Sequence, residues 1–305
     1  MAGYKLASYH SARGQRAGVV VDDALFDAAE LTGQAAYASV LGILEDWDQA
    51  RATLRMATAN INSTARKLSE TRLLAPVLWP PTIYCAGANY TDHVAEMAKR
   101  RNQAPEPDPH TLGLKPWHFI KASRALADPG ATIATSHYSK MMDWEAELAA
   151  VIGRPARNIA IENALDYVAG YTIANDLSAR DLSRRAHISD TSPFKADWLA
   201  HKSFEGACPL GPWITPAEDV PDPHNLGIKL WVNDVIKQDS NTGGMIFNLN
   251  EQIAHISSRI TLHPGDVILT GTPAGVGAGR NEFLEPGDVV KIWIERIGTL
   301  TNSFA

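Results

Sequence analysis

The sequence predicts an α+β fold dominated by β-strands, with a small α/β module at the N-terminus. Short apolar runs separated by Gly and Pro recur over most of the chain, and long stretches with helical spacing are few. A cluster of prolines, Pro76, Pro80 and Pro81, is followed by a change in sequence pattern. We therefore predict two domains, a small module over residues 1–75 and a main domain over residues 76–305.

The N-terminal module combines short strands with one helical stretch. Runs of apolar residues predict strands at 5–9, 17–21 and 24–26. From residue 36 to residue 58 the apolar residues recur at helical spacing, which predicts one helix with its apolar stripe against the core.

The main domain has the pattern of a strand-rich fold. Its apolar runs predict strands at 82–86, 148–152, 167–174, 228–232, 267–270 and 289–294. One further helix is predicted over residues 248–260, where Leu249, Ile253 and Ile256 share a face. A Pro-rich stretch at 104–109 indicates a mobile loop.

The composition is that of an ordinary globular protein, with 45% hydrophobic and 20% charged residues. The formal net charge of −6 gives no reason to expect a nucleic acid or an anionic membrane as partner. No run of about 18 or more apolar residues indicates a transmembrane helix, and the first residues lack the apolar segment of a signal peptide. Cys85 and Cys208 lie in apolar segments and are expected as buried thiols, so we predict a cytoplasmic protein.

The stretch Asp143-Trp-Glu145-Ala-Glu147 places two carboxylates two residues apart at the start of an apolar run. In a β-strand, side chains at i and i+2 point to the same face, so Glu145 and Glu147 are expected side by side. Asp176 follows the next apolar strand and can add a third carboxylate. Buried acids share a proton or a cation, and an all-oxygen set favours Mg²⁺ or Mn²⁺ over zinc. The alternative is a set of surface acids that pair with Arg or Lys.

Residues 89–97 follow a predicted strand and carry His93 and Glu96, which lie one turn apart if this segment is helical. Thr91 or Asp92 can cap such a helix. A carboxylate beside an imidazole raises its basicity, which is how a histidine becomes a general base for water. The Pro-rich stretch that follows would allow this helix to act as a lid. An ordinary surface pair on a helix is the alternative.

A Gly-rich turn follows the strand predicted at 267–270, and its N–H groups and the Thr272 hydroxyl can bind a carboxylate or phosphate. The turn lacks the lysine of a P-loop and no helical pattern follows it, so a nucleotide site is not predicted. Lys202 heads an apolar segment and either holds an anionic oxygen or is an ordinary surface lysine. Arg180 follows Asp176 by about one turn and either reaches the same pocket or pairs with the acid next to it.

Taken together, these motifs resemble the signature of the fumarylacetoacetate hydrolase superfamily. The matching segments, in chain order, are Asn89-Tyr-x-Asp-His93-x-x-Glu96, Glu145-x-Glu147, Asn175-Asp176-x-Ser-Ala-Arg180-Asp181, Lys202-Ser-Phe and Thr270-Gly-Thr272-Pro-x-Gly-Val-Gly277. Each motif alone is ordinary, whereas all five in this order are specific. The resemblance covers residues from about 80 to 300, and the first 75 residues look like the variable N-terminal module of many members.

The resemblance implies a mixed β-sandwich roll for the main domain and a homodimer as the assembly. It implies Mg²⁺ or Mn²⁺ held by Glu145, Glu147 and Asp176, with a small 2-oxo acid as substrate. A divalent cation polarises the carbonyl of such a substrate and stabilises the enolate formed when the adjacent C–C bond breaks.

The resemblance also implies roles for individual side chains. In the hydrolytic members the pair that matches His93 and Glu96 activates water, and the residue that matches Lys202 steadies negative charge. The substrate contacts that it implies are Asn89, Arg180, Gly271 and Thr272.

Two features depart from the family pattern. Many members have a substrate-binding Gln three residues after the matching arginine, and here this position is Ser183. The interval from Asp181 to Lys202 is also longer than in compact members and is expected to reshape the pocket around the distal part of the substrate. Its basic residues indicate either a polar or second anionic group there, or a solvated loop: Arg184, Arg185, His187 and Lys195.

We therefore predict a Mg²⁺-dependent hydrolase that cleaves a C–C bond in a 2,4-dioxo acid of the acylpyruvate type, with His93 and Glu96 activating water. The main alternative uses the same metal site without hydrolysis, as an isomerase, tautomerase or decarboxylase of a 2-oxo acid such as oxaloacetate. A third alternative is a ligand-binding protein without turnover. The retained carboxylates, Lys202 and the His93–Glu96 pair argue against it, because a binding protein needs no group that activates water.

Overall fold

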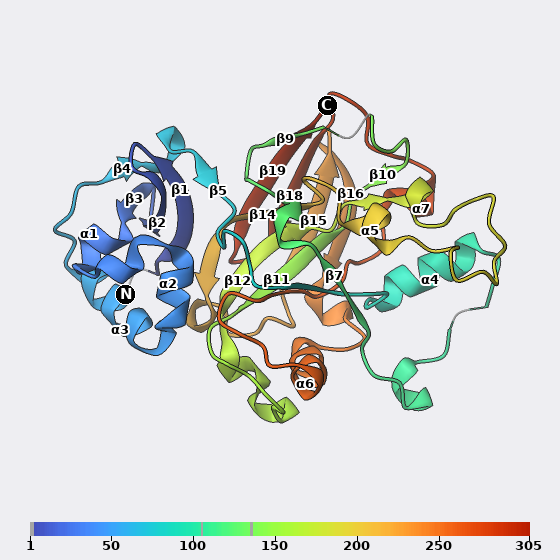
Figure 1. The fold of residues 1–305 in the computed structure, drawn as a ribbon, viewed down its shortest axis with the longest axis horizontal. Coiled ribbons are helices and arrows are strands. Elements are labelled where there is room, and N and C mark those ends of the chain that lie inside the picture. Colours follow the sequence, from blue (N-terminus) through green and yellow to red (C-terminus); the bar gives the residue numbers. More distant parts are fainter. Residues whose placement is uncertain (1–2, 105, 135–136) are drawn as a thin grey trace.

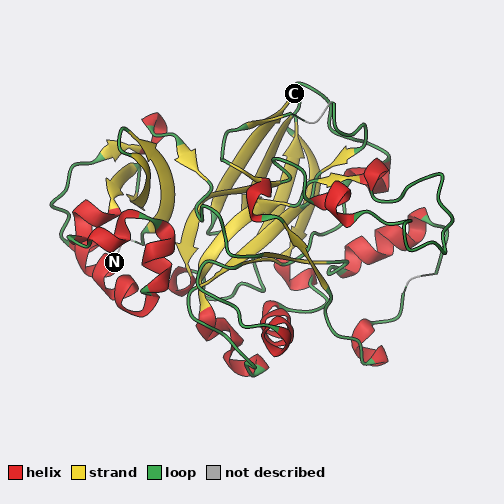
Figure 2. Ribbon diagram, viewed as in Figure 1, coloured by secondary structure: helices red, strands yellow, loops and turns green. Residues whose placement is uncertain are grey.

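The computed structural model describes residues 3–104, 106–134 and 137–305. In these ranges a 12-stranded sheet runs in the order β4-β3-β2-β1-β14-β12-β11-β17-β6-β7, with β5 and β8 attached at its side. A 5-stranded sheet runs in the order β16-β15-β18-β19-β9, and β10 pairs with β13. The strand-rich α+β class predicted from the sequence is confirmed (Figure 2).

The strands of the main domain that belong to the large sheet are β6 (Ile83–Ala86), β7 (His118–Lys121), β8 (Leu126–Ala127), β11 (Ala146–Ile152), β12 (Val168–Asn175), β14 (Cys208–Pro216) and β17 (Val267–Leu269), and β5 (Leu73–Leu74), just before residue 76, pairs with β1. Those of the smaller sheet are β9 (Thr132–Ile133), β15 (Gly227–Val232), β16 (Val235–Asn241), β18 (Val289–Ile294) and β19 (Gly298–Phe304). The short pair is β10 (Met142–Asp143) and β13 (Ser178–Ala179). The six strands predicted for the main domain are confirmed, with ends that differ by at most two residues.

The helices of the main domain lie around the sheets, and α4 and α6 are the longest of them (Figure 1). They are α4 (Thr91–Arg100), α5 (Trp198–Lys202), α6 (Leu249–Arg259) and α7 (Gly277–Arg280). The described residues contain no helix that is long and apolar enough to cross a membrane.

The N-terminal residues form the α/β unit at the left of Figure 1. Its elements are β1 (Lys5–Ser11), β2 (Gly14–Val21), β3 (Ala24–Asp27), β4 (Arg66–Lys67), α1 (Ala28–Thr32), α2 (Val40–Glu45) and α3 (Trp47–Ala59). Strand β1 pairs with β14 of the main domain at Leu6 and Ile214, so the large sheet continues from one part into the other. The division at residue 75 stays a prediction.

The single helix predicted over residues 36–58 is wrong. A 3₁₀ turn at Ala35–Ala38, α2 and α3 replace it. Ser39 has extended backbone angles, and its hydroxyl accepts a hydrogen bond from the Gly42 N–H at 3.0 Å, which starts a new helix. The apolar stripe still faces the core as predicted, because Val40, Ile43, Leu44, Trp47 and Leu54 are all buried.

Strand β11 lies in the middle of the molecule and is buried on both faces. Leu148, Ala150 and Ile152 belong to the core between the two sheets, whereas Ala149 and Val151 face the core shared with the N-terminal module. A strand buried on both sides reads as a continuous apolar run, which is the pattern seen in the sequence. Because alternate residues share a face, Glu145 and Glu147 lie on the side of Ala149, away from the smaller sheet.

Helix α6 shows how local sequence fixes an element near the cavity described below. The Asn248 side chain accepts a hydrogen bond from the Glu251 N–H at 3.0 Å, and the Glu251 carboxylate accepts one from the Asn248 N–H at 2.9 Å. This capping box begins the helix directly after Phe247, a residue that lines the cavity. The helix predicted at 248–260 is confirmed as α6.

We expect Asn248→Ala to lower the free energy of unfolding by about 1 kcal/mol, because the side-chain acceptor at the N-cap is lost. Asn248→Ser keeps an acceptor oxygen and is expected to recover most of this loss. Urea denaturation followed by far-UV circular dichroism measures both variants. Equal stability of the Ala and Ser variants would contradict the assigned cap.

Candidate active site

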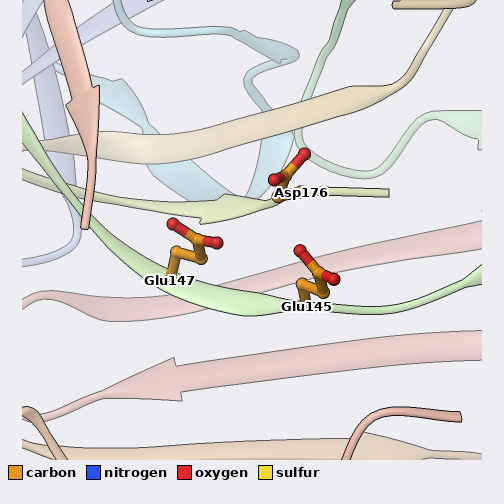
Figure 3. A group of neighbouring side chains, drawn as sticks. All are labelled: Glu145, Glu147 and Asp176. Atoms are coloured by element: carbon orange, nitrogen blue, oxygen red, sulfur yellow. The ribbon is translucent and has the colours of Figure 1, made fainter. Parts of the chain in front are cut away.

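Three carboxylates converge where two neighbouring strands meet. Strand β11 pairs with β12 with Ala146 opposite Asn175, so Glu145 before one strand faces Asp176 after the other. The Asp176 N–H donates to the Glu145 carbonyl at 2.9 Å, which fixes this end of the ladder. Oxygen atoms of Glu145, Glu147 and Asp176 all lie within 4.8 Å of one another, and all three residues are buried (Figure 3). The predicted side-by-side placement of the carboxylates is therefore confirmed, and the alternative of surface acids is wrong because all three residues are buried.

Two predicted cations neutralise much of this buried negative charge. The Lys202 ammonium, at the end of α5, lies 2.7 Å from carboxylate oxygens of both Glu145 and Asp176. The Arg180 guanidinium donates to Glu145 and, through Nε, to Asp143 at 2.8 Å. Arg180 thus reaches the pocket and does not pair with Asp181, which instead accepts a hydrogen bond from the Lys140 N–H at 3.1 Å.

A third cation, Lys121 on β7, is buried with 2% of its surface exposed. Its ammonium donates to the carbonyl oxygens of Leu177, Lys202 and Ala207 at 3.1, 2.5 and 2.8 Å. It also lies 2.8 Å from Asp176 Oδ1. An ammonium has three donors, and the three carbonyls use them, so its interaction with Asp176 is mainly electrostatic. Lys121 therefore connects the segment that carries Asp176 with the end of α5 that carries Lys202.

The two glutamates have opposite protonation preferences. Burial alone would raise the pKa of Glu145, but Lys202 and Arg180 outweigh burial and hold that pKa well below its usual range. Burial raises the pKa of Glu147, and the carboxylates of Asp176 and Glu145 raise it further. The centre holds four buried acids when Asp143 is included, against the three cations, which leaves one negative charge in excess. A proton on Glu147 or a bound cation removes this excess.

The residues present fit a divalent metal ion. Asp176 Oδ1 is buried and accepts no hydrogen bond from the described residues. The donor set is three carboxylates without Cys or His, which suits Mg²⁺ or Mn²⁺. Glu147 Oε2 accepts a hydrogen bond from the Gly271 N–H at 2.6 Å, which orients that carboxylate toward its partners. The acids present are therefore suited to hold the ion that the sequence led us to expect.

His93 and Glu96 lie on α4, and His93 lines the cavity described below. His93 Nδ1 is 3.7 Å from Glu96 Oε2, too far for a hydrogen bond, and it has no partner among the described residues. The Gly275 N–H donates to the Glu96 carboxylate at 3.1 Å. Burial would raise the pKa of Glu96, but His93 and the Gly275 amide lower it below its usual value, so the carboxylate is ionised beside the imidazole.

The predicted cap of this helix is wrong. Tyr90 is the N-cap residue, and neither Thr91 nor Asp92 caps α4 with its side chain. Asp92 accepts a local hydrogen bond from the His93 N–H at 2.7 Å. Its carboxylate also accepts hydrogen bonds from the Ser240 hydroxyl at 3.1 Å and the Ala274 N–H at 3.2 Å. These contacts hold α4 against the Gly-rich turn, so its first turn is placed by tertiary packing.

The Gly-rich turn supports the site mainly through backbone groups. The Gly271 N–H is used by Glu147, and the Thr272 hydroxyl accepts a hydrogen bond from Gln238 Nε2 at 2.9 Å. Asn89 binds the backbone of Phe247 and Thr270 through its amide at 2.8–2.9 Å. Their roles as substrate contacts stay predictions. The prediction that no helix follows this turn is wrong, because the short helix α7 begins at Gly277.

A cavity of about 1060 Å³ connects these groups. Its lining includes eight of the ten predicted site residues, all except Glu96 and Gly271. Helix α4 and the following Pro-rich segment, whose residue 105 lies outside the described residues, also contribute to its walls. The cavity therefore joins the three carboxylates to His93, whose neighbour Glu96 does not line it.

The longer interval before Lys202 does not bring positive charge to this cavity. Arg184 and Lys195 pair with Asp190, and Arg185 pairs with Asp197, so each of these three cations has an acidic partner within the segment. None of the four basic residues named above lines the cavity. The structure therefore favours the solvated-loop interpretation over a second anion site.

Sequence reasoning missed three residues that organise the site: Lys121, Asp143 and Gln238. Asp143 accepts hydrogen bonds from the N–H groups of Gly277 and Ala278 at 2.6 and 2.9 Å and so joins α7 to Arg180. The sequence contains a pattern that could have identified Asp143. It precedes Glu145 by two residues, just as Glu145 precedes Glu147, and this spacing places all three side chains on one face of an extended segment. Lys121 ends a short apolar run in the sequence. This position alone does not predict burial, which depends on the segments that pack around the lysine in the fold.

We expect Lys121→Met to lower the free energy of unfolding by about 3–5 kcal/mol, because it leaves Asp176 and three carbonyl groups without their buried cation. Lys229→Met is the matched control, since Lys229 forms an exposed pair with Asp239 at 3.2 Å. The control is expected to cost no more than about 1 kcal/mol. Urea denaturation measures both, and similar losses would contradict the role assigned to Lys121.

Comparison with known proteins agrees with this geometry. A family model described as fumarylacetoacetate (FAA) hydrolase C-terminal matches residues 82–305. The chain is 39% identical to a mitochondrial oxaloacetate tautomerase of Xenopus laevis over 259 residues, which cover 84% of this chain and 76% of that protein. It is 40% identical to a mitochondrial oxaloacetate tautomerase of Homo sapiens over 259 residues, or 84% and 77% of the two chains.

Solved structures extend the similarity to nearly the whole chain. Maleylpyruvate hydrolase from Sphingobium sp. SYK-6, in complex with manganese(II) and pyruvate, has a TM-score of 0.75 at 30% identity, covering 99% of this chain and 98% of that one. The 5-carboxymethyl-2-hydroxymuconate delta-isomerase from Mycobacterium smegmatis has a TM-score of 0.72 at 30% identity, covering 99% of each chain. The family model matches most of the chain, and the buried carboxylate centre agrees with that match. The chain therefore belongs to the fumarylacetoacetate hydrolase family of enzymes.

Proposed function

We propose that the protein is a Mg²⁺- or Mn²⁺-dependent tautomerase of oxaloacetate or a closely similar 2-oxo acid. The observation that carries the proposal is the charge balance of the cavity. A divalent ion would change the excess of one negative charge into one positive charge, which suits an anionic 2-oxo acid. The identity of 39–40% to proteins named oxaloacetate tautomerases supports this reaction over the others in the family.

The chemistry requires transfer of a proton between the enol oxygen and C3 of the substrate. A divalent ion, when bound, supplies the positive charge that polarises the 2-oxo group and stabilises negative charge on its oxygen. Lys202 adds a fixed ammonium beside the same end of the cavity. Glu145 and Asp176 keep this ammonium protonated, because they raise the pKa of Lys202 against the effect of burial.

His93 is the group that moves the proton in this proposal. Its Nδ1 atom has no partner among the described residues, and the side chain lines the cavity. The ionised Glu96 carboxylate 3.7 Å away favours the imidazolium that forms when the ring accepts a proton. One base that accepts and then returns the proton is sufficient for tautomerisation.

Hydrolysis of an acylpyruvate is the second candidate, and the His93–Glu96 pair is the observation that favours it. In that reaction His93 would take a proton from water as the oxygen adds to the distal carbonyl. The C3–C4 bond would then break, with its electron pair delocalised into the 2-oxo group. The cavity of about 1060 Å³ also exceeds the needs of a substrate as small as oxaloacetate.

One assay separates the candidates. The enol of oxaloacetate and a set of acylpyruvates are each followed by ultraviolet absorbance and by proton NMR. Faster conversion of the oxaloacetate enol to the keto form supports the tautomerase, a new carboxylic acid from an acylpyruvate supports the hydrolase, and carbon dioxide indicates decarboxylation. Chelation with EDTA should abolish the activity and Mg²⁺ or Mn²⁺ should restore it. Full activity after complete metal removal would contradict the metal dependence.

We expect the apparent affinity for Mg²⁺ or Mn²⁺ to increase with pH by up to about tenfold per pH unit. The raised pKa of Glu147 favours a protonated carboxyl in the metal-free site, and the metal must displace this proton. Calorimetric titrations in buffers of different ionisation enthalpy measure the released proton. Glu147→Gln should lose both metal affinity and proton release. An affinity independent of pH would mean that Glu147 is already ionised.

We expect His93→Gln to lower kcat by roughly 10²–10⁴, the usual contribution of a general base, with metal affinity unchanged. His10→Gln is the matched control, because His10 is exposed on β1 and outside the cavity. Enol absorbance gives kcat, and calorimetry gives metal affinity. Wild-type turnover in the His93 variant would exclude His93 as the proton-transfer group.

The homodimer and the cytoplasmic location stay proposals. The vertebrate relatives are named as mitochondrial proteins, and a relative that is 41% identical over 240 residues comes from Staphylococcus aureus. Sedimentation equilibrium measures the assembly directly.

A further inference from the structure

The segment between Asp181 and Lys202 brings ring side chains to the cavity instead of charges. Its last part forms α5, which places Trp198 and His201 in the cavity lining. Trp117, which directly precedes β7, and Phe119, which lies in β7, line the same cavity. The set of four rings, here called the aromatic wall, consists of Trp117, Phe119, Trp198 and His201.

The rings of the aromatic wall contact one another in sequence. Phe119 and Trp198 are stacked with centroids 5.2 Å apart, and Trp117 meets Trp198 edge-on at 5.7 Å. His201 lies 5.7 Å from Trp198 on the same helix. These contacts hold the rings in a fixed surface, so an aromatic ligand would meet it with little further ordering.

The aromatic wall begins beside the metal-binding carboxylates and extends to the cavity opening. The Lys202 ammonium, which touches Glu145 and Asp176, lies 5.2 Å from the Phe119 ring centre. Trp198 is 47% exposed, as expected for a side chain at the mouth of a cavity. A substrate whose oxo-acid end lies at the carboxylates would therefore place its other end along the wall.

His201 is the polar member of the wall. Only 7% of its surface is exposed, and its Nε2 atom is buried without a hydrogen-bond partner in the described part of the chain. Burial, Lys202 and Arg180 lower the pKa of His201 to about 3, so the ring is neutral at physiological pH. A buried polar atom without a partner in a cavity is typical of a ligand contact.

We propose that the aromatic wall is a distal subsite for a planar, conjugated substituent of the 2-oxo acid, with His201 Nε2 binding a polar group on that substituent. The inference rests on the proposed function only in placing the oxo-acid end at the carboxylates. It extends the substrate class from oxaloacetate to aryl-substituted 2-oxo acids, because a flat ring can stack on the wall and a saturated ring cannot.

The test uses two ligands of matched size, phenylpyruvate and cyclohexylpyruvate, titrated into the Mg²⁺-loaded protein. Their Kd values are measured by calorimetry in the wild type and in Trp198→Leu. In the wild type the preference for the phenyl compound should be roughly 2- to 10-fold greater than in the variant. Phe119→Leu is a second variant on the same wall, and circular dichroism verifies that each variant is folded.

Trp79→Leu is the matched control, because Trp79 is 42% exposed and does not line the cavity. It should keep the wild-type preference. The same preference in the wild type, Trp198→Leu and Phe119→Leu would overturn the subsite.

His201→Phe keeps a ring and removes the nitrogen atoms. It should lower the preference for 4-hydroxyphenylpyruvate over phenylpyruvate by about 2- to 10-fold. An unchanged preference would remove His201 from the subsite. The oxaloacetate assay on the same wild-type sample separates the two proposals. Tautomerisation without a ring preference contradicts only the subsite, and a ring preference without tautomerisation contradicts only the reaction.

Discussion

The constraint on which the rest of the structure depends is the burial of four carboxylates in one small volume. An ionised acid is costly to bury unless a cation or hydrogen bonds compensate it, and here the compensation comes from three distant segments. Lys121, Lys202 and Arg180 reach the acids from β7, α5 and the turn after β13. Because the cations are one charge short, the centre favours a further proton or a bound cation at Glu147.

The fold supplies the framework that makes this balance possible. The antiparallel register of β11 and β12 brings Glu145 and Asp176 to the same end of the ladder. The Gly271 N–H orients Glu147, and Asp143 joins α7 to Arg180. The same turn that follows β17 binds Glu96 through the Gly275 N–H, so the His93–Glu96 pair on α4 and Glu147 are held by one turn. Backbone amides thus orient Glu147, Glu96 and Asp143, whereas the side-chain cations hold Glu145 and Asp176.

Two walls of the cavity differ in what they can recognise. The wall at the carboxylates is charged and suits an anionic group, whereas the aromatic wall is uncharged and includes the half-exposed Trp198. In our proposals the reaction takes place at the first wall and the second sets the substrate preference, so variants can separate the two.

The sequence by itself determined the fold class, the main strands, the three carboxylates and the two cations Lys202 and Arg180. These follow from local patterns, since strand alternation places Glu145 beside Glu147 and a motif order identifies the family. Only the tertiary structure decided that Lys121 compensates Asp176, that Ser39 divides the predicted N-terminal helix, and that the long interval contributes Trp198 and His201. The reason is physical: charge compensation and cavity lining join residues far apart in the chain, and local periodicity carries no record of which distant segments meet.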